Sequence, residues 1–288
     1  MNDNVYLNGR IIPAGEAAVG VWDAGFLHGA STFTTMRAHH GKVFRLDAHL
    51  ERLMSTAELL GLRTDAAPDA LARGVSELLG ANGLGESRVR ITLTPGSVRD
   101  GEATTLITAE PLPHYPPEWY EKGIMVVVSS FKQPSGTITA GYKTGCYLPR
   151  ILAQRKAAAK GAVEALWYTG DNRLAEACFC NVFLVTGAKV FTPPRDTPVL
   201  PGVVRAAVIE LCGRLGIPCD DGTPLTVREM LSCEEMFLTG SCSGLRPVVA
   251  VERHVVGDGQ GGPVTRRLMQ AYAEMLDAEC PPAPAGHD

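Results

Sequence analysis

A proline-rich segment, PLPHYPPEWYEKG at 111–123, constrains the fold of this chain more than any other feature. It carries four prolines in thirteen residues. Proline lacks a backbone N–H and has a fixed φ, so this segment can continue neither a helix nor a central strand. We therefore expect a small N-terminal domain at 1–112, a linker at 113–123 and a larger domain at 124–280. A disordered tail is expected at 281–288.

The stretch before the linker alternates between strand and helix patterns. Asn8-Gly9, the strongest two-residue hairpin signal, predicts a turn between two short strands. Asp47 is a good N-cap, and apolar residues recur on one helical face after it. Other elements are expected at 31–46 (two strands with a turn at Gly41), 68–80 (a helix), 87–95 and 104–111 (strands). Helices segregated from antiparallel strands are typical of an α+β domain.

The alternation restarts after the linker. A strand, GIMVVVSSF, is followed by a helix expected at 148–160 and then by a meander of short strands with turns at 170–172 and Gly187. Further helices are expected in VVRAAVIELCGRLG and in PVTRRLMQAYAEMLDA. The whole chain is therefore predicted to be α+β, built from two α/β domains with antiparallel or mixed sheets.

Charge, hydropathy and cysteine spacing exclude several classes of protein. The net charge is −4 with no long charge run, which argues against nucleic-acid binding. No apolar stretch approaches the length of a membrane span, and the N-terminus has no signal-peptide pattern, so we expect a cytoplasmic protein. The eight cysteines form no CxxC pair, so no metal site is expected. In a reducing compartment they are expected to be small buried hydrophobic residues.

Two charged residues stand out in apolar surroundings. Lys143 lies at a predicted strand-to-helix junction, flanked by Tyr142 and Tyr147. Taken alone, it has an ordinary explanation as a surface lysine. Glu176, in RLAEACFCNVF, lies within a strand otherwise made of apolar residues. A carboxylate there is costly unless a cation or a donor pairs with it.

Two glycine-containing turns offer places for an anion. In LPGVVRAAV, Pro201-Gly202 places the amides of Val203 and Val204 at a helix N-terminus, although a plain turn is an equal alternative. LTGSCSG, at 238–244, offers backbone N–H groups and hydroxyls after a strand. A lysine, an isolated acid and two anion cradles suit pyridoxal 5′-phosphate. The lysine forms the Schiff base, the acid holds the proton of the ring nitrogen, and the helix turn holds the phosphate.

These motifs, in this order, resemble the class IV (fold type IV) pyridoxal-phosphate enzymes. This family includes branched-chain aminotransferases, D-amino-acid aminotransferases and 4-amino-4-deoxychorismate lyases. The resemblance covers roughly residues 4–276 and rests on FRLDAHLERL, KTGCYL, AEACFCNVF, LPGVVR and LTGSCSGLRPV. It implies a D-amino-acid aminotransferase-like fold, a homodimer, and small amino-acid and 2-oxo-acid substrates.

The resemblance also implies a cofactor site around the catalytic Lys143. Carried over position by position, it assigns the phosphate to Arg52, the cofactor's 3-hydroxyl to Tyr147 and the ring nitrogen to Glu176. The remaining cofactor-binding residues implied are Gly202, Val203, Val204 and Ser241. Three positions depart from the family pattern, namely Ala175, Ala177 and Val204. The valine removes a hydroxyl contact to the phosphate but leaves the backbone amides in place.

The reaction is left open between two enzymes. The C-terminal run VVGDGQGGPVTRRLMQAY resembles aminotransferases, which move an amino group between a branched-chain or D-amino acid and a 2-oxo acid. Thr35, in TFTTMRA, resembles the lyases, which release pyruvate and form 4-aminobenzoate in the folate pathway. There the hydroxyl would be catalytic, although a strand threonine needs no such role. A non-enzymatic carrier of the cofactor is a third alternative, which the presence of both Lys143 and Glu176 disfavours.

The substrate-binding residues that the resemblance implies come from both domains. Arg37 and Arg90 lie where the family places substrate-facing residues, and either could pair with a carboxylate. Both also fit as solvated strand arginines. His28, in FLHGAS, replaces a tyrosine of the branched-chain enzymes, which argues against a purely aliphatic pocket. Cys242 and Ser243 complete the expected set.

Overall fold

A computed structural model describes residues 3–99, 101–134 and 136–282 of the chain. The chain forms two compact units, which are described separately. The second unit comprises His114–Tyr142 and Tyr147–Glu274, and the first comprises Met1–Pro113, Lys143–Cys146 and Met275–Asp288. Within the described ranges, no helix is both long and apolar enough to cross a membrane.

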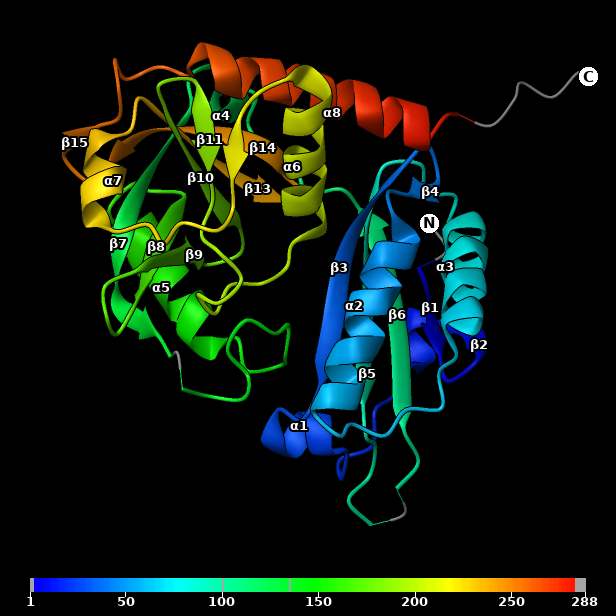
Figure 1. Cartoon of the computed structure of the whole chain (residues 1–288). Coiled ribbons are helices and arrows are strands. Elements are labelled where there is room, and N and C mark those ends of the chain that lie inside the picture. The colour runs from blue at the N-terminus through cyan, green and yellow to red at the C-terminus, as the bar shows by residue number, and fades with distance from the viewer. Residues whose placement is uncertain (1–2, 100, 135, 283–288) are drawn as a thin grey trace, which may run out of the picture. The chain divides into compact units, whose positions relative to one another are not determined.

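The first unit is built on a six-stranded antiparallel sheet with the order β2-β1-β6-β5-β3-β4. Its strands are β1 (Asn4–Leu7), β2 (Arg10–Pro13), β3 (Thr32–His39), β4 (Lys42–Val43), β5 (Ser87–Thr94) and β6 (Thr104–Pro111). Its helices are η1 (Ala14–Glu16, a 3₁₀ turn), α1 (Ala24–His28), α2 (Leu46–Leu59) and α3 (Pro68–Asn82). The helix α2 packs on β3, and α3 packs on β1 and β6 (Figure 1).

The two faces of this sheet differ because side chains alternate along each strand. Met36 and Ala38 of β3 are fully buried in the apolar core, together with Leu53 of α2 and Leu78 of α3. Thr35, one position away from Met36, points to the opposite face and is only half-buried. That opposite face also carries Phe33 and Arg37 of β3.

The second unit is built on a nine-stranded mixed sheet with the order β12-β11-β10-β13-β14-β7-β8-β9, and β15 pairs with β14. Its strands are β7 (Ile124–Gln133), β8 (Glu164–Thr169), β9 (Leu174–Ala177), β10 (Asn181–Thr186), β11 (Lys189–Phe191), β12 (Cys219–Asp220), β13 (Glu235–Gly240), β14 (Gly244–Val251) and β15 (His254–Val255). Strand β7 runs parallel to both β8 and β14, whereas β8–β9 and β10–β13 are antiparallel.

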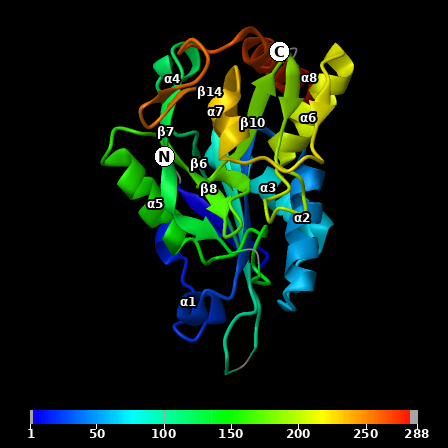
Figure 2. The same cartoon turned by 60° about the vertical axis from the view of Figure 1, so that its left-hand side comes forward.

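Helices flank this mixed sheet on both sides. They are α4 (Glu118–Glu121), α5 (Leu148–Ala158), α6 (Val203–Leu215), α7 (Val227–Ser232) and α8 (Pro263–Glu279), the last of which passes into the first unit at Met275. Figure 2 shows α5 on one side of the strands and α6 on the other. Ala153 and Ala157 of α5 pack against Val127 and Trp167 of the sheet.

The predicted α+β class, with one antiparallel and one mixed sheet, is confirmed. The predicted N-cap at Asp47 is wrong. The helix α2 begins at Leu46, and its N-cap is Arg45 in a left-handed conformation (φ 49°). Asp47 instead lies in the first turn, where its charge is favourable near the helix N-terminus. The predicted linker contains α4, and most of the predicted tail, 283–288, lies outside the described residues.

Candidate active site

The segment that carries Lys143 is attached to the start of β3 in the first unit. The carbonyl oxygen of Lys143 accepts hydrogen bonds from Thr32 Oγ1 and Phe33 N, both at 3.0 Å. Gly145 N donates to Ser31 O at 2.9 Å. These bonds flank Thr144, the residue after the lysine, and hold the backbone of this segment against the start of β3.

The side chain of Lys143 shares an aromatic ring with an arginine. Its Nζ lies 4.7 Å from the centre of the Phe33 ring, and the guanidinium carbon of Arg90 lies 3.7 Å from the same centre. Both distances are within the range of a cation–π interaction. Thr35 is two residues from Phe33 on the same strand face and pairs directly with Arg90 across β3 and β5. The structure thus brings together three predicted site residues, Lys143, Arg90 and Thr35.

The face of β3 that packs against α2 holds a buried polar group. His49 Nδ1 lies 2.9 Å from Thr34 Oγ1, and Arg52 Nη2 donates to both, at 3.3 and 3.1 Å respectively. Burial, together with the positive charges of Arg52 and Lys143, holds the pKa of His49 well below its ordinary value. A neutral His49 can accept the donor of Arg52 and so orient it. Sequence reasoning missed His49, although its three-residue spacing from Arg52 places both on one helix face.

Arg37, which was predicted to face a substrate, is engaged by an acid of its own unit. Its Nη2 lies 2.8 Å from Glu86 Oε2, and His39 Nδ1 lies 2.5 Å from the other oxygen of Glu86. Burial would raise the pKa of Glu86, but the contacts with Arg37 and His39 outweigh it and lower this pKa. The structure therefore gives Arg37 a structural partner. His28, the last residue of α1, is exposed.

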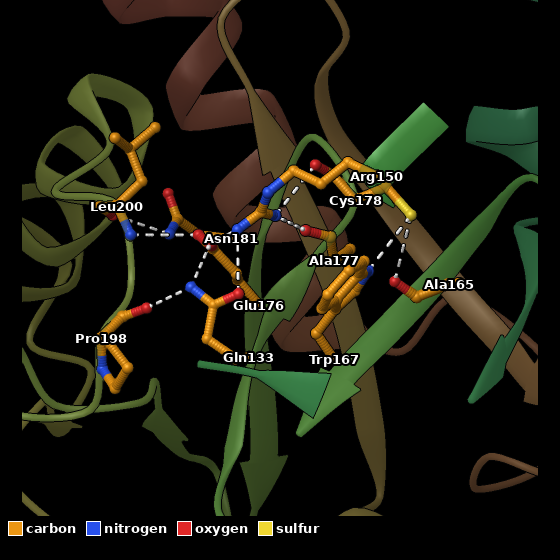
Figure 3. Close-up of polar contacts among 10 residues, drawn as sticks. All are labelled: Gln133, Arg150, Ala165, Trp167, Glu176, Ala177, Cys178, Asn181, Pro198 and Leu200. Atoms are coloured by element: carbon orange, nitrogen blue, oxygen red, sulfur yellow. Dashed lines mark hydrogen bonds and ion pairs between the residues drawn. The ribbon is translucent and has the colours of Figure 1, made fainter. Parts of the chain in front are cut away.

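In the second unit, the Glu176 carboxylate is buried at the centre of a hydrogen-bond cluster (Figure 3). Its Oε1 accepts from Arg150 Nη2 at 2.5 Å and, more weakly, from Gln133 Nε2 at 3.5 Å. Its Oε2 accepts from Leu200 N at 3.0 Å. The sequence predicted that this acid needs a cation or a donor beside it, and such partners are present. It did not identify them as Arg150 and Gln133.

Arg150 projects from the first turn of α5 and bridges several groups. Its Nη1 donates to Ala177 O and Cys178 O, both at 3.0 Å, and its Nη2 also donates to Gln133 Oε1 at 3.1 Å. Burial alone would lower the pKa of Arg150, but the adjacent Glu176 carboxylate raises it above its ordinary value. No local sequence pattern marks Arg150, because its partners lie on β9 and β7.

The predicted anion cradle after Pro201 is a helix N-terminus. Gly202 is the N-cap of α6, which begins at Val203. A Cβ atom at Gly202 would lie 2.0 Å from Asn181 Oδ1, so a larger residue would clash there. The first N–H groups of a helix lack intrahelical partners and carry partial positive charge, which suits a phosphate. The side chains of Val203 and Val204 are buried, so only backbone groups are available.

The other predicted contacts also lie in the second unit. Tyr147 is the N-cap of α5, and its ring stacks on Phe179 with 6.0 Å between centroids. Ser241, Cys242 and Ser243 form the turn between β13 and β14. Ser243 is buried, and its carbonyl accepts a hydrogen bond from the Tyr120 hydroxyl at 3.0 Å. In the described part of the chain, no three His, Cys, Asp or Glu side chains cluster so as to hold a metal ion.

Comparisons with known proteins support the family and the fold. The profile of the family "Amino-transferase class IV" matches residues 31–251. The branched-chain-amino-acid aminotransferase of Escherichia coli is 29% identical, with 96% of this chain and 94% of that protein covered. A crystal structure of the branched-chain enzyme from this species covers 97% of this chain at a TM-score of 0.91 and 27% identity, with 96% of its own chain covered, which confirms the predicted fold.

Two other structures match at similar coverage. A branched-chain amino acid aminotransferase from T.th., solved with pyridoxamine 5′-phosphate, has a TM-score of 0.90 and 26% identity, with 98% and 96% of the two chains covered. A Legionella pneumophila protein assigned as a 4-amino-4-deoxychorismate lyase has a TM-score of 0.82 and 23% identity, with 91% and 96% covered. At that identity the second match supports the fold alone.

Proposed function

Since this chain belongs to the class IV aminotransferases, we propose that it uses pyridoxal 5′-phosphate to move an amino group between an amino acid and a 2-oxo acid. The observation that carries this proposal is the shared position of Lys143 and Arg90 over the Phe33 ring. Both substrates carry a carboxylate next to the carbon that reacts. An amine and a guanidinium that both contact one ring suit that pair of groups, because a guanidinium matches a carboxylate.

The residues present fit the cofactor. Glu176 is a buried carboxylate that still has acceptor capacity for a ring N–H, and the N-terminus of α6 after Gly202 offers backbone amides for a phosphate. Lys143 would bind the aldehyde, and Arg52, held by Thr34 and His49, would add a charge for the phosphate. Further contacts are proposed for Tyr147, Val203, Val204 and Ser241.

When bound, the cofactor supplies an aldehyde that takes up the amino group and a ring that accepts the electron pair from the substrate Cα–H bond. The protein's residues do the rest. The amino group of Lys143 removes the Cα proton and returns it as a general base and acid. Glu176 keeps the ring nitrogen protonated, and Arg90 orients the substrate carboxylate. His28, Cys242 and Ser243 are proposed as further substrate contacts.

We favour a branched-chain amino acid as donor, with a D-amino acid as the other class to test. Support comes from relatives named branched-chain aminotransferases, and the T.th. enzyme has been solved with 4-methylvaleric acid and with N-(5′-phosphopyridoxyl)-L-glutamate. We expect 2-oxoglutarate to accept the amino group. Incubation with L- or D-leucine and 2-oxoglutarate, followed by mass spectrometry of the 2-oxo acid formed, tests the proposal. If no amino acid of either hand reacts, the aminotransferase proposal fails.

Borohydride labelling tests the assignment of the lysine. Reduction of the cofactor-loaded protein should fix the cofactor on the peptide that contains Lys143. Lys156, on the later part of α5, serves as the internal comparison. A label on Lys156, or no label, would contradict the role of Lys143.

A second candidate function, 4-amino-4-deoxychorismate lyase, is favoured by one observation. Thr35 pairs with Arg90 on the face that also carries Phe33, so its hydroxyl lies close to the proposed substrate site. A hydroxyl there would suit proton delivery to a leaving pyruvate unit. Pyruvate release from aminodeoxychorismate, and its loss in Thr35→Val, would support this function. No pyruvate from the wild-type protein would exclude it.

We also propose a homodimer. Several large apolar side chains of the first unit are exposed, and Val21, Trp22, Phe26 and Val98 are among them. The backbones of Trp22 and Val98 are joined by a hydrogen bond of 2.9 Å, so at least these two lie together. Exposed apolar groups of this kind mark association surfaces.

A further inference from the structure

Groups of the second unit occupy most of the hydrogen-bond acceptor positions of the Glu176 carboxylate. A carboxylate offers about four acceptor positions on its two oxygens. Arg150 and Gln133 occupy Oε1, and Leu200 N occupies one position on Oε2. About one acceptor position therefore remains, on Oε2. The carboxylate is thus set to receive one further donor from one direction.

Arg150 holds this arrangement from a rigid position. Its Nη1 is bound to the carbonyls of Ala177 and Cys178, the two residues that follow Glu176. Its guanidinium carbon also lies 5.3 Å from the centre of the Trp167 ring and 5.8 Å from that of Tyr147. These contacts prevent the guanidinium from swinging away, so it meets the carboxylate in one geometry (Figure 3).

The pairing also gives the buried acid its counter-charge. The exposed fraction of the side chain is 17% for Arg150 and 5% for Glu176. A carboxylate so poorly solvated is costly unless a cation lies beside it. Gln133 cannot supply that cation, because its amide is neutral and already donates to Pro198 O at 2.6 Å. Arg150 is the cation that contacts this acid among the residues that the structure describes.

We propose that Arg150 is a positioning residue whose charged hydrogen bond holds the Glu176 carboxylate in place to receive the ring N–H of the cofactor. This inference rests on the proposed function. Arg150 itself acts only through Glu176. Without Arg150, the buried carboxylate loses both its counter-charge and the donor that fixes its direction, so its contact with the ring N–H would weaken.

The test compares two ligands of the apo-protein. One is pyridoxal 5′-phosphate, and the other is 1-deazapyridoxal 5′-phosphate, in which C–H replaces the ring nitrogen. The ratio of their dissociation constants, from fluorescence titration, reports the contact with Glu176. It cancels the contribution of the phosphate, which both ligands share. For the wild type we expect a preference of about tenfold or more for the nitrogen ligand, as for a charge-assisted hydrogen bond.

Arg150→Met should lose most of this preference. Arg150→Lys keeps a positive charge and should retain most of it. The matched control is Arg155→Met, because Arg155 is an exposed arginine of the same helix. It should behave as wild type.

The outcomes of these titrations separate the inference about Arg150 from the proposed function. An unchanged ratio in Arg150→Met overturns the inference. If Arg150→Met does not fold, as judged by circular dichroism, Arg150→Lys decides. A lost preference in Arg150→Lys then overturns the inference. If the wild-type protein binds neither ligand, the proposed function itself fails.

Discussion

At the scale of single residues, the proposed chemistry depends most on Lys143. Lys143→Ala removes the amine that we propose binds the cofactor and moves the Cα proton. A positioned base alone contributes about 10²–10⁴ in rate, so we expect turnover to fall by at least that factor. The fold should survive, because the segment is held through the carbonyl oxygen of Lys143, which accepts from Thr32 Oγ1 and Phe33 N. Steady-state assays with Lys156→Ala as the control check this, and a tenth of the wild-type rate in Lys143→Ala would mean that another base acts.

The proposed role of Arg90 as a ligand of the substrate carboxylate can be tested separately from its place in strand β5. Arg90→Met should weaken binding of 4-methylvaleric acid, a carboxylate without an amine, by about 10²-fold, as for a lost charge-paired contact. Arg88 lies two residues away on the same strand and pairs with the exposed Glu110, so Arg88→Met is the matched control. Equal losses in both variants, measured by competition with the amino-acid substrate, would contradict the assignment.

A site residue is easier to predict from the sequence when its partners lie close to it along the chain. Glu176 could be predicted because a lone acid among apolar strand residues needs a partner. The identity of that partner could not, since Arg150 is 26 residues away and on a different element. His49 remained hidden for a similar reason. Its helix pattern is local, but its bond to Thr34 joins α2 to β3.

At the scale of elements, periodicity and turn residues predicted most strands and helices close to their observed bounds. The hairpin turn at Asn8-Gly9 and the helix α5 are examples. The cap of α2 was predicted wrongly, because Arg45 adopts a left-handed conformation that its residue type does not favour. The short helix α1 was also missed, since five residues give too little periodicity.

The helix α1 owes its position to one buried acid, Asp23. Its Oδ1 accepts from the amides of Gly25 and Phe26, and its Oδ2 accepts from the hydroxyls of Thr94 and Thr104. Burial would raise the pKa of Asp23, but these four donors outweigh it and lower this pKa below the ordinary value. The stabilisation is therefore present above the unfolded-state pKa of about 3.9 and is lost as the pH falls through the lower, folded-state value.

The lowered pKa of Asp23 leads to a prediction for α1. Asp23→Asn should lower the thermal unfolding midpoint at neutral pH, and the difference from wild type should shrink as the pH falls below about 4. Asp69→Asn, which removes an exposed carboxylate in the first turn of α3, is the control and should show a smaller difference at neutral pH. A difference between Asp23→Asn and wild type that is constant from neutral to acidic pH would show that charge plays no part in holding α1.

At the scale of the whole molecule, the exposed apolar residues of the first unit predict self-association. Phe26 is 75% exposed and lies on α1, two residues from the proposed substrate residue His28. Burying such side chains is the main source of stability in a dimer, and a charge in their place opposes it. We expect light scattering at micromolar concentration to give the mass of a dimer for the wild type and a shift toward the monomer for Phe26→Asp. Leu59→Asp, at an exposed leucine on α2, should leave the mass unchanged.

If the site is completed by the partner copy near His28, Phe26→Asp should also lose activity, and raising the protein concentration should restore part of that activity by mass action. A fully active wild-type monomer would contradict both the dimer and this dependence of the site on it.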